Sequence, residues 1–157
     1  MKILVAVDLS DSNDYLITET IRMATALSAR VCLLHVTEVH SSLVGYEAFY
    51  EEGFGNFPDP ELIRESMAER FRHEHKKLHN LTKQLQAGGV SCFANLSHAA
   101  INAVETILEQ AEKHDAGMII IGTHNKGVMA RLLVGSTSSG VLQKTKLPVL
   151  VVPVSGG

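Results

Sequence analysis

Glycines and hydroxyl side chains late in the chain have a spacing suited to binding phosphate. Gly122 directly follows the apolar run Met118 to Ile121, and Gly135 directly precedes four hydroxyl residues, 136–139. Backbone N–H groups at the start of a helix are unpaired donors backed by the positive end of the helix dipole, and hydroxyls can add bonds to phosphate oxygens. A strand, a glycine loop and a hydroxyl-rich helix start therefore predict an anion-binding site.

The same loop does not have the sequence of an ATPase phosphate loop. Gly122 and Gly127 have the spacing of a Walker loop, but Val128 and Met129 stand where that loop has its lysine and its serine or threonine. Two cations in the loop are candidates for neutralising phosphate charge, with solvent exposure as the equal alternative: Lys126 and Arg131.

The residue types give little support for a dedicated catalytic site. Asp8 ends the first apolar run, and a carboxylate there is not suited to bind phosphate. The sequence shows no Ser-His-Asp order around a nucleophile elbow, no paired carboxylates in one motif and no activated cysteine. We therefore expect that the protein has no catalytic residues and is not an enzyme, with at most slow hydrolysis of a bound triphosphate beside Asp8.

The histidines have ordinary explanations as well as functional ones. His75 and His79 lie one helical turn apart, but a solvated face is favoured over a metal site because no carboxylate or cysteine completes the set. His35 is interpreted as a strand residue with a satisfied hydrogen bond. His124 could touch phosphate or point to water.

Composition restricts the class of protein. The 157 residues fit one domain, 1–157, and the 14 basic against 17 acidic residues lack the broad positive field that nucleic-acid binding requires. The apolar runs are too short to insert in a membrane, and Met1 leads straight into a strand-like run, so we expect a cytoplasmic protein. Cys32 and Cys92 lie in apolar stretches without metal-type spacing and are interpreted as buried, reduced thiols.

Apolar runs and helical spacing alternate along the chain. The first run shows no polar alternation, as expected for a central parallel strand covered on both faces. The five predicted strands are Ile3 to Val7, Val31 to Val36, Val90 to Ala94, Met118 to Ile121 and Pro148 to Val152. Four helices are expected between them: one after capping candidates 10–13, one marked by Ile63 to Leu85, one from Ala100 and one from Ser136. This order predicts an α/β protein with a mostly parallel sheet and helices on both faces.

The segment from Thr37 to Pro60 fits neither pattern. It combines glycine and proline with aromatic residues between Tyr46 and Phe57, whose rings need something to cover. The alternatives are closure over a bound ligand and participation in a dimer contact.

Several separate motifs resemble the universal stress protein family. They are the start Ile3 to Ser10, Leu34 to Val36, Ile120 to His124, Leu132 to Ser138 and the ending Leu147 to Val152. The resemblance spans nearly the whole chain and implies a Rossmann-like, open five-stranded parallel sheet of order 3-2-1-4-5. It also implies a nucleotide over the carboxyl ends of strands 1 and 4, where the winding of an open α/β sheet reverses.

The resemblance implies ATP or AMP as the ligand, with or without a Mg²⁺ or Mn²⁺ ion held through the phosphates and no metal site of the protein itself. The adenine and ribose would meet Ala6, Val7, Asp8 and Val36. The phosphates would meet Gly122, His124, Asn125, Gly127, Gly135, Ser136, Thr137 and Ser138.

Asn125 is the one departure from the family's ATP-binding pattern, Gly-x2-Gly-x9-Gly-Ser/Thr. It replaces the second glycine while the spacing to Gly122 and Gly135 is kept. Asparagine tolerates positive φ, but its side chain stands where bare backbone could approach the ligand. A turn shifted to Gly127 is an alternative.

The resemblance and the residues that carry it imply two alternative functions. The first is a stress-response regulatory protein that binds ATP or AMP and changes conformation or the affinity for a protein partner. The alternative, favoured by Asn125, is a scaffold that binds no nucleotide and acts through protein contacts. In both, the apolar strand Val149 to Val152 lies at a sheet edge and predicts a homodimer.

Overall fold

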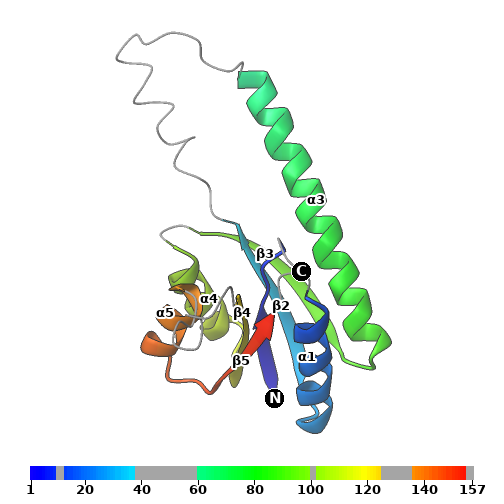
Figure 1. Ribbon diagram of the computed structural model, residues 1–157, viewed down its shortest axis with the longest axis vertical. Helices are drawn as coiled ribbons and strands as arrows, with labels where there is room; N and C mark the ends of the chain where they lie inside the picture. The colour runs from blue at the N-terminus through cyan, green and yellow to red at the C-terminus, as the bar shows by residue number, and fades with distance from the viewer. Residues whose placement is uncertain (10–12, 38–59, 100–101, 125–135, 155–157) are drawn as a thin grey trace.

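A five-stranded parallel sheet forms the centre of the molecule (Figure 1). The computed structural model describes residues 1–9, 13–37, 60–99, 102–124 and 136–154. The strands are β1 (Lys2–Ala6), β2 (Arg30–Thr37), β3 (Cys92–His98), β4 (Met118–His124) and β5 (Val149–Val154). Their order is β3-β2-β1-β4-β5, with every neighbouring pair parallel, so the expected fold class and strand order are confirmed.

Helices cover both faces of the sheet (Figure 1). They are α1 (Asp14–Ala26), α3 (Pro60–Ala87), α4 (Ala103–Lys113) and α5 (Ser136–Lys144). In β1, Ile3 and Val5 pack with residues of α1 and α3, whereas Leu4 and Ala6 pack with residues of α4 and α5. This two-sided burial is the reason that the first strand is apolar at every position.

The third strand begins later than the sequence predicts. Gly89 has a φ of 80°, its N–H bonds to Gln86 O, and the N–H of Val90 bonds to Leu85 O. These two bonds close the end of α3 as a Schellman motif, and Leu85 and Val90 belong to the same buried cluster. Val90 therefore serves helix termination, and the prediction of a strand over Val90 to Ala94 is wrong at both ends.

One helix start differs from expectation, and another has the expected position without a capping bond from its side chain. α4 begins at Ala103 rather than Ala100, because Asn102 caps it by accepting a bond from Glu105 N–H at 3.0 Å. Asn13 stands at the N-cap of α1 but makes no capping bond with its side chain. Its amide donates instead to Asp8 O at 2.8 Å, which connects the helix start to the end of β1.

The cysteines are both free, but only one is deeply buried. Cys32 is 2% exposed in β2, as expected. Cys92 is only half-buried because it begins β3, which lies at the edge of the sheet. The expectation that both thiols are buried is therefore wrong for Cys92.

Candidate functional site

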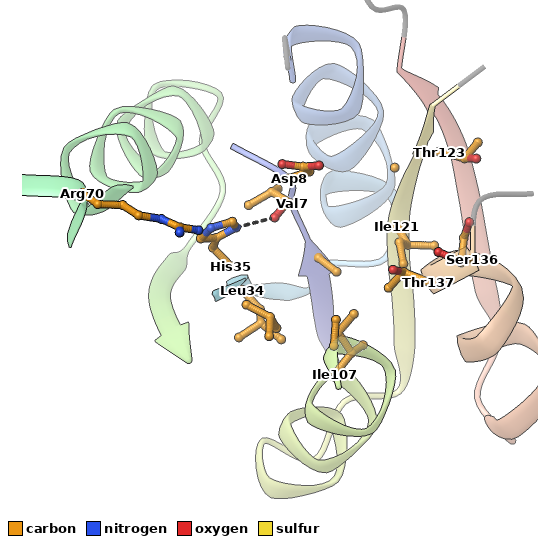
Figure 2. A pocket seen from close by; sticks show the side chains of 15 residues that line it. Val7, Asp8, Leu34, His35, Arg70, Ile107, Ile121, Thr123, Ser136 and Thr137 are labelled. Carbon is orange, nitrogen blue, oxygen red and sulfur yellow. Dashed lines mark hydrogen bonds between the residues drawn. The ribbon is translucent and has the colours of Figure 1, made fainter. Parts of the chain in front are cut away.

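A cavity of about 440 Å³ opens at the carboxyl ends of β1, β2 and β4 (Figure 2). This is the point at which successive connections leave the sheet in opposite directions, and it is where open α/β sheets bind ligands. Its lining comprises Ala6, Val7, Asp8, Leu34, His35, Val36, Arg70, Ala103, Ile107, Ile121, Gly122, Thr123, Ser136, Thr137 and Ser138. The volume lies within the range of small-molecule sites, roughly 300–1,000 Å³.

The backbone that follows β1 is held by groups from several different elements. Val7 N–H bonds to Leu34 O of β2 at 2.9 Å. Asn13 donates to Asp8 O, and Lys77 Nζ of α3 donates to Leu9 O at 2.9 Å. The segment that carries the Asp8 carboxylate to the cavity is therefore fixed from α1, β2 and α3 together.

His35 lies in the floor of the cavity and is 8% exposed. Its Nδ1 lies 2.9 Å from Val7 O. A carbonyl oxygen can only accept, so Nδ1 carries the hydrogen and Nε2 is the remaining ring nitrogen. The interpretation of His35 as a strand residue with a satisfied hydrogen bond is confirmed.

The start of α5 supplies hydroxyl groups to one side of the cavity. Ser136, Thr137 and Ser138 form its first turn, and Ser138 is buried with 2% exposure. The first N–H groups of a helix have no partner within the helix. The hydroxyl-rich start predicted from the sequence therefore lines the cavity as a potential anion-binding end.

Gly122 lies in β4 beside this end and has a packing role as well. A Cβ placed on Gly122 would lie 3.2 Å from Val154 Cγ1 and 3.5 Å from Leu16 Cδ2. Any larger residue would push against β5 and α1. The absence of a side chain here keeps β4 close to its neighbours at the edge of the cavity.

Apolar side chains form the rest of the wall. Leu34 and Ile121 come from the strands that flank β1, and Ala103 and Ile107 come from α4. Since β1 separates β2 from β4, the two flanking strands lie two strand spacings apart, about 9.6 Å. A flat, partly apolar ligand with an anionic group at one end matches this lining.

Part of the predicted site falls outside the described residues. His124 ends β4, and its side chain is among the parts that the structure leaves undescribed. Other candidates outside the description are Asn125, Lys126, Gly127, Arg131 and Gly135, together with the aromatic segment from Tyr46 to Phe57. The remaining predicted residues all line this cavity: Ala6, Val7, Asp8, Val36, Gly122, Ser136, Thr137 and Ser138.

Arg70 of α3 was not anticipated by the sequence. It lines the cavity beside the residues of β1 and β2, and its Nε donates to Glu74 Oε1 at 2.8 Å. The pair has the i, i+4 spacing of an ordinary helix-surface ion pair. The sequence feature that indicates this placement is the position of Arg70 next to Phe71, on the apolar side of the helix.

Within the described ranges, no group of three or more His, Cys, Asp or Glu side chains could hold a metal ion. His75 and His79 instead border an open groove between α3 and β3. No described helix combines the length and apolar character needed to cross a membrane.

Sequence comparison relates the chain to one family. The model of the universal stress protein family matches residues 1–153. Universal stress protein A homolog 2 of Coxiella burnetii is 30% identical over 156 residues, which cover 99% of this chain and 96% of that protein.

Structural comparison gives the same fold. A universal stress protein in complex with cAMP superposes with a TM-score of 0.64 at 18% identity, covering 99% of this chain and 98% of the other. The universal stress protein from Archaeoglobus fulgidus in complex with dAMP gives 0.61 at 19% identity, covering 96% of each. Because the family model matches residues 1–153 and the sheet has the order 3-2-1-4-5, this chain belongs to the universal stress protein family.

Proposed function

We propose that this chain is a nucleotide-binding regulatory protein of the stress response, which binds ATP or AMP and changes conformation or partner affinity with occupancy. One observation carries the proposal: the cavity at the switch point is lined by a hydroxyl-rich helix start and by a carboxylate, Asp8, from the end of β1. The helix start suits phosphate, and a carboxylate suits ribose hydroxyls or an exocyclic amine.

The comparisons support an adenine nucleotide in particular. Two structures of the same fold have cAMP and dAMP bound, and both ligands combine adenine with a single phosphate. AMP is the ligand closest to these. ATP, alone or with Mg²⁺ or Mn²⁺ held through its phosphates, is the extension that the glycine spacing from Gly122 to Gly135 favours.

Calorimetric titration of the purified chain with ATP, AMP and adenosine tests the proposal. Ser136→Glu is the informative variant. A carboxylate in the first turn interacts favourably with the helix dipole, so the helix is preserved, but the carboxylate repels phosphate. Ser136→Gln is the matched control, with the same length and no charge. We expect Ser136→Glu to weaken the binding of AMP and ATP at least tenfold and to leave the affinity for adenosine unchanged. Absence of nucleotide-dependent heat in the parent protein would contradict the proposal.

We propose binding without dedicated catalysis. Among the described lining residues, Asp8 and His35 are the groups closest in type to a general base. Slow hydrolysis near Asp8 is compatible with this function. Steady ATP turnover well above a blank would instead indicate a hydrolase.

A dimeric scaffold without nucleotide is the second candidate, and Asn125 in the second glycine position favours it. Heat denaturation of freshly purified protein, followed by chromatography of the supernatant, separates the two functions. Released adenine nucleotide supports the first. A nucleotide-free protein that also gives no calorimetric signal supports the scaffold.

We also propose a homodimer through β5 in either case, working in the cytoplasm as the composition leads us to expect. β5 is an edge strand, and β4 is its one neighbour in the described sheet. Val149, Leu150 and Val151 remain half-buried there, so pairing with a second copy would cover apolar surface and satisfy open backbone groups.

A further inference from the structure

Arg70 brings a positive charge to the cavity from a helix that carries none of the glycine-motif residues. Its side chain is 55% exposed, and its Nε donates to Glu74 Oε1 at 2.8 Å. Among the described residues that line the cavity, it is the one Lys or Arg. Any ligand that fills the cavity therefore meets this cation.

Glu74 holds Arg70 in place. The carboxylate side chain is 11% exposed, and within the described part of the chain no group donates to its second oxygen, Oε2. A buried carboxylate that loses its cation is strongly unfavourable, so the guanidinium stays beside Glu74. Because Nε–H is used by this bond, the hydrogens on the two terminal nitrogens of Arg70 are the ones that can meet a ligand.

Arg70 and the hydroxyl end lie on different sides of the cavity. Figure 2 shows Arg70 beside His35 of β2, whereas Thr123 of β4 and Ser136 of α5 lie on the other side of β1. The strand order separates β2 from β4 by about 9.6 Å, two strand spacings. A nucleotide whose phosphate meets the start of α5 would thus extend its base toward Arg70.

We propose that Arg70, positioned by Glu74, contacts the aromatic base of the bound nucleotide and so selects nucleosides over sugar phosphates. This inference rests on the proposed nucleotide function. A guanidinium plane stacks on aromatic rings, and its terminal N–H groups donate to ring nitrogens, which are acceptors. Leu34 and Ile107 belong to the apolar cluster on the α4 face of the sheet and add an apolar wall to the same cavity.

Comparison of three ligands on the full chain tests the assignment. AMP, adenosine and ribose 5-phosphate are titrated into the parent, Arg70→Ala and Arg70→Lys, with weak ligands measured by displacement of AMP. We expect Arg70→Ala to weaken the binding of AMP and of adenosine by the same factor, about tenfold, and to leave the affinity for ribose 5-phosphate unchanged. Arg70→Lys keeps a cation beside Glu74 but lacks the plane, so it should show a smaller loss for the same two ligands.

Arg72→Ala is the matched control, because Arg72 is exposed on the same helix and borders the groove between α3 and β3 instead. It should leave all three affinities unchanged. Circular dichroism checks folding. If Arg70→Ala unfolds, Arg70→Ala with Glu74→Gln removes the unpaired buried charge and takes its place.

The outcomes separate the two proposals. If the parent binds AMP and Arg70→Ala binds all ligands equally well, the base contact is wrong and the nucleotide function stands. If Arg70→Ala loses binding of AMP and ribose 5-phosphate but still binds adenosine, the phosphate lies at Arg70 and the inference is also overturned. A parent that binds no adenine nucleotide overturns both.

Discussion

His35 Nδ1 lies 2.9 Å from the carbonyl oxygen of Val7, and this bond joins β2 to the residue that follows β1. The N–H of Val7 bonds to Leu34 O of the same neighbouring strand. Both backbone groups of Val7 are therefore satisfied before any ligand arrives. The cavity floor is a preformed surface, which reduces the ordering that binding would otherwise require.

Replacement of His35 by phenylalanine should destabilise the fold. The new ring has a similar size but cannot donate, so the buried Val7 carbonyl loses its partner at a cost of about 1–3 kcal/mol in the free energy of unfolding. Urea unfolding measures the loss. His73→Phe, at an exposed position of α3, is the control and should change the stability by less than about 0.5 kcal/mol. Equal stability of His35→Phe and the parent would show that the bond contributes nothing.

A methyl group at Gly140 should disturb the packing of α5 on α4. The added Cβ would lie 2.7 Å from Val104 Cγ2, and valine in a helix has little rotamer freedom to move away. Overpacking costs about 1–3 kcal/mol, which exceeds the gain of about 1 kcal/mol from replacing glycine in a helix.

The sign of this effect should reverse when Val104 is shortened. In a Val104→Ala background the clash disappears, so Gly140→Ala should stabilise by up to about 1 kcal/mol. Thermal or urea unfolding of the four proteins completes a double-mutant cycle. Additive effects of the two substitutions would mean that α5 moves freely with respect to α4.

Stability should fall in alkaline solution through the Cys32 thiol. Burial raises the pKa of Cys32 from 9.0 to about 11. Between these pH values the unfolded chain releases a proton that the folded chain retains, so the free energy of unfolding decreases as the pH rises from 9 to 11. Cys32→Ala removes this component, and its stability should decrease less steeply over the same interval than that of the parent. Parallel curves for the two proteins would contradict the raised pKa.

The parallel sheet could be predicted from the residues, and the order of its strands and the location of the cavity from the resemblance to the universal stress protein family. β1 and β4 are apolar at successive positions because both faces of the sheet are covered, and this pattern marks central parallel strands. The carboxyl ends of such strands meet at one edge. Asp8 and Ser136 could therefore be expected near each other although 128 positions separate their numbers.

The remaining features depend on contacts that a linear pattern does not show. Arg70 and Glu74 have the spacing of a surface ion pair, and only the packing of α3 beside β2 brings the arginine to the cavity. Val90 begins the predicted third strand, but its N–H closes α3 instead of pairing with β2. Cys92 is half-buried since its strand has one neighbour rather than two in the described sheet.

The backbone of β5 indicates how to test the proposed dimer without damage to the sheet. Ile119 N–H bonds to Pro148 O, so residues 148, 150 and 152 direct their backbone groups toward β4. The alternate residues Val149, Val151 and Pro153 direct theirs away from it. Pro153 already lacks an N–H at such a position, which is where an edge strand tolerates proline.

Val151→Pro should therefore dissociate the dimer and leave the monomer folded. It removes an outward N–H that a second copy would use, while the bonds from residues 150 and 152 toward β4 persist. Val151→Ala is the matched control, because it shortens the side chain but keeps the N–H. Sedimentation at micromolar concentration should give dimers for the parent and Val151→Ala and monomers for Val151→Pro. Since both variants lose side-chain volume, only the backbone donor separates them. A dimeric Val151→Pro would move the interface away from β5.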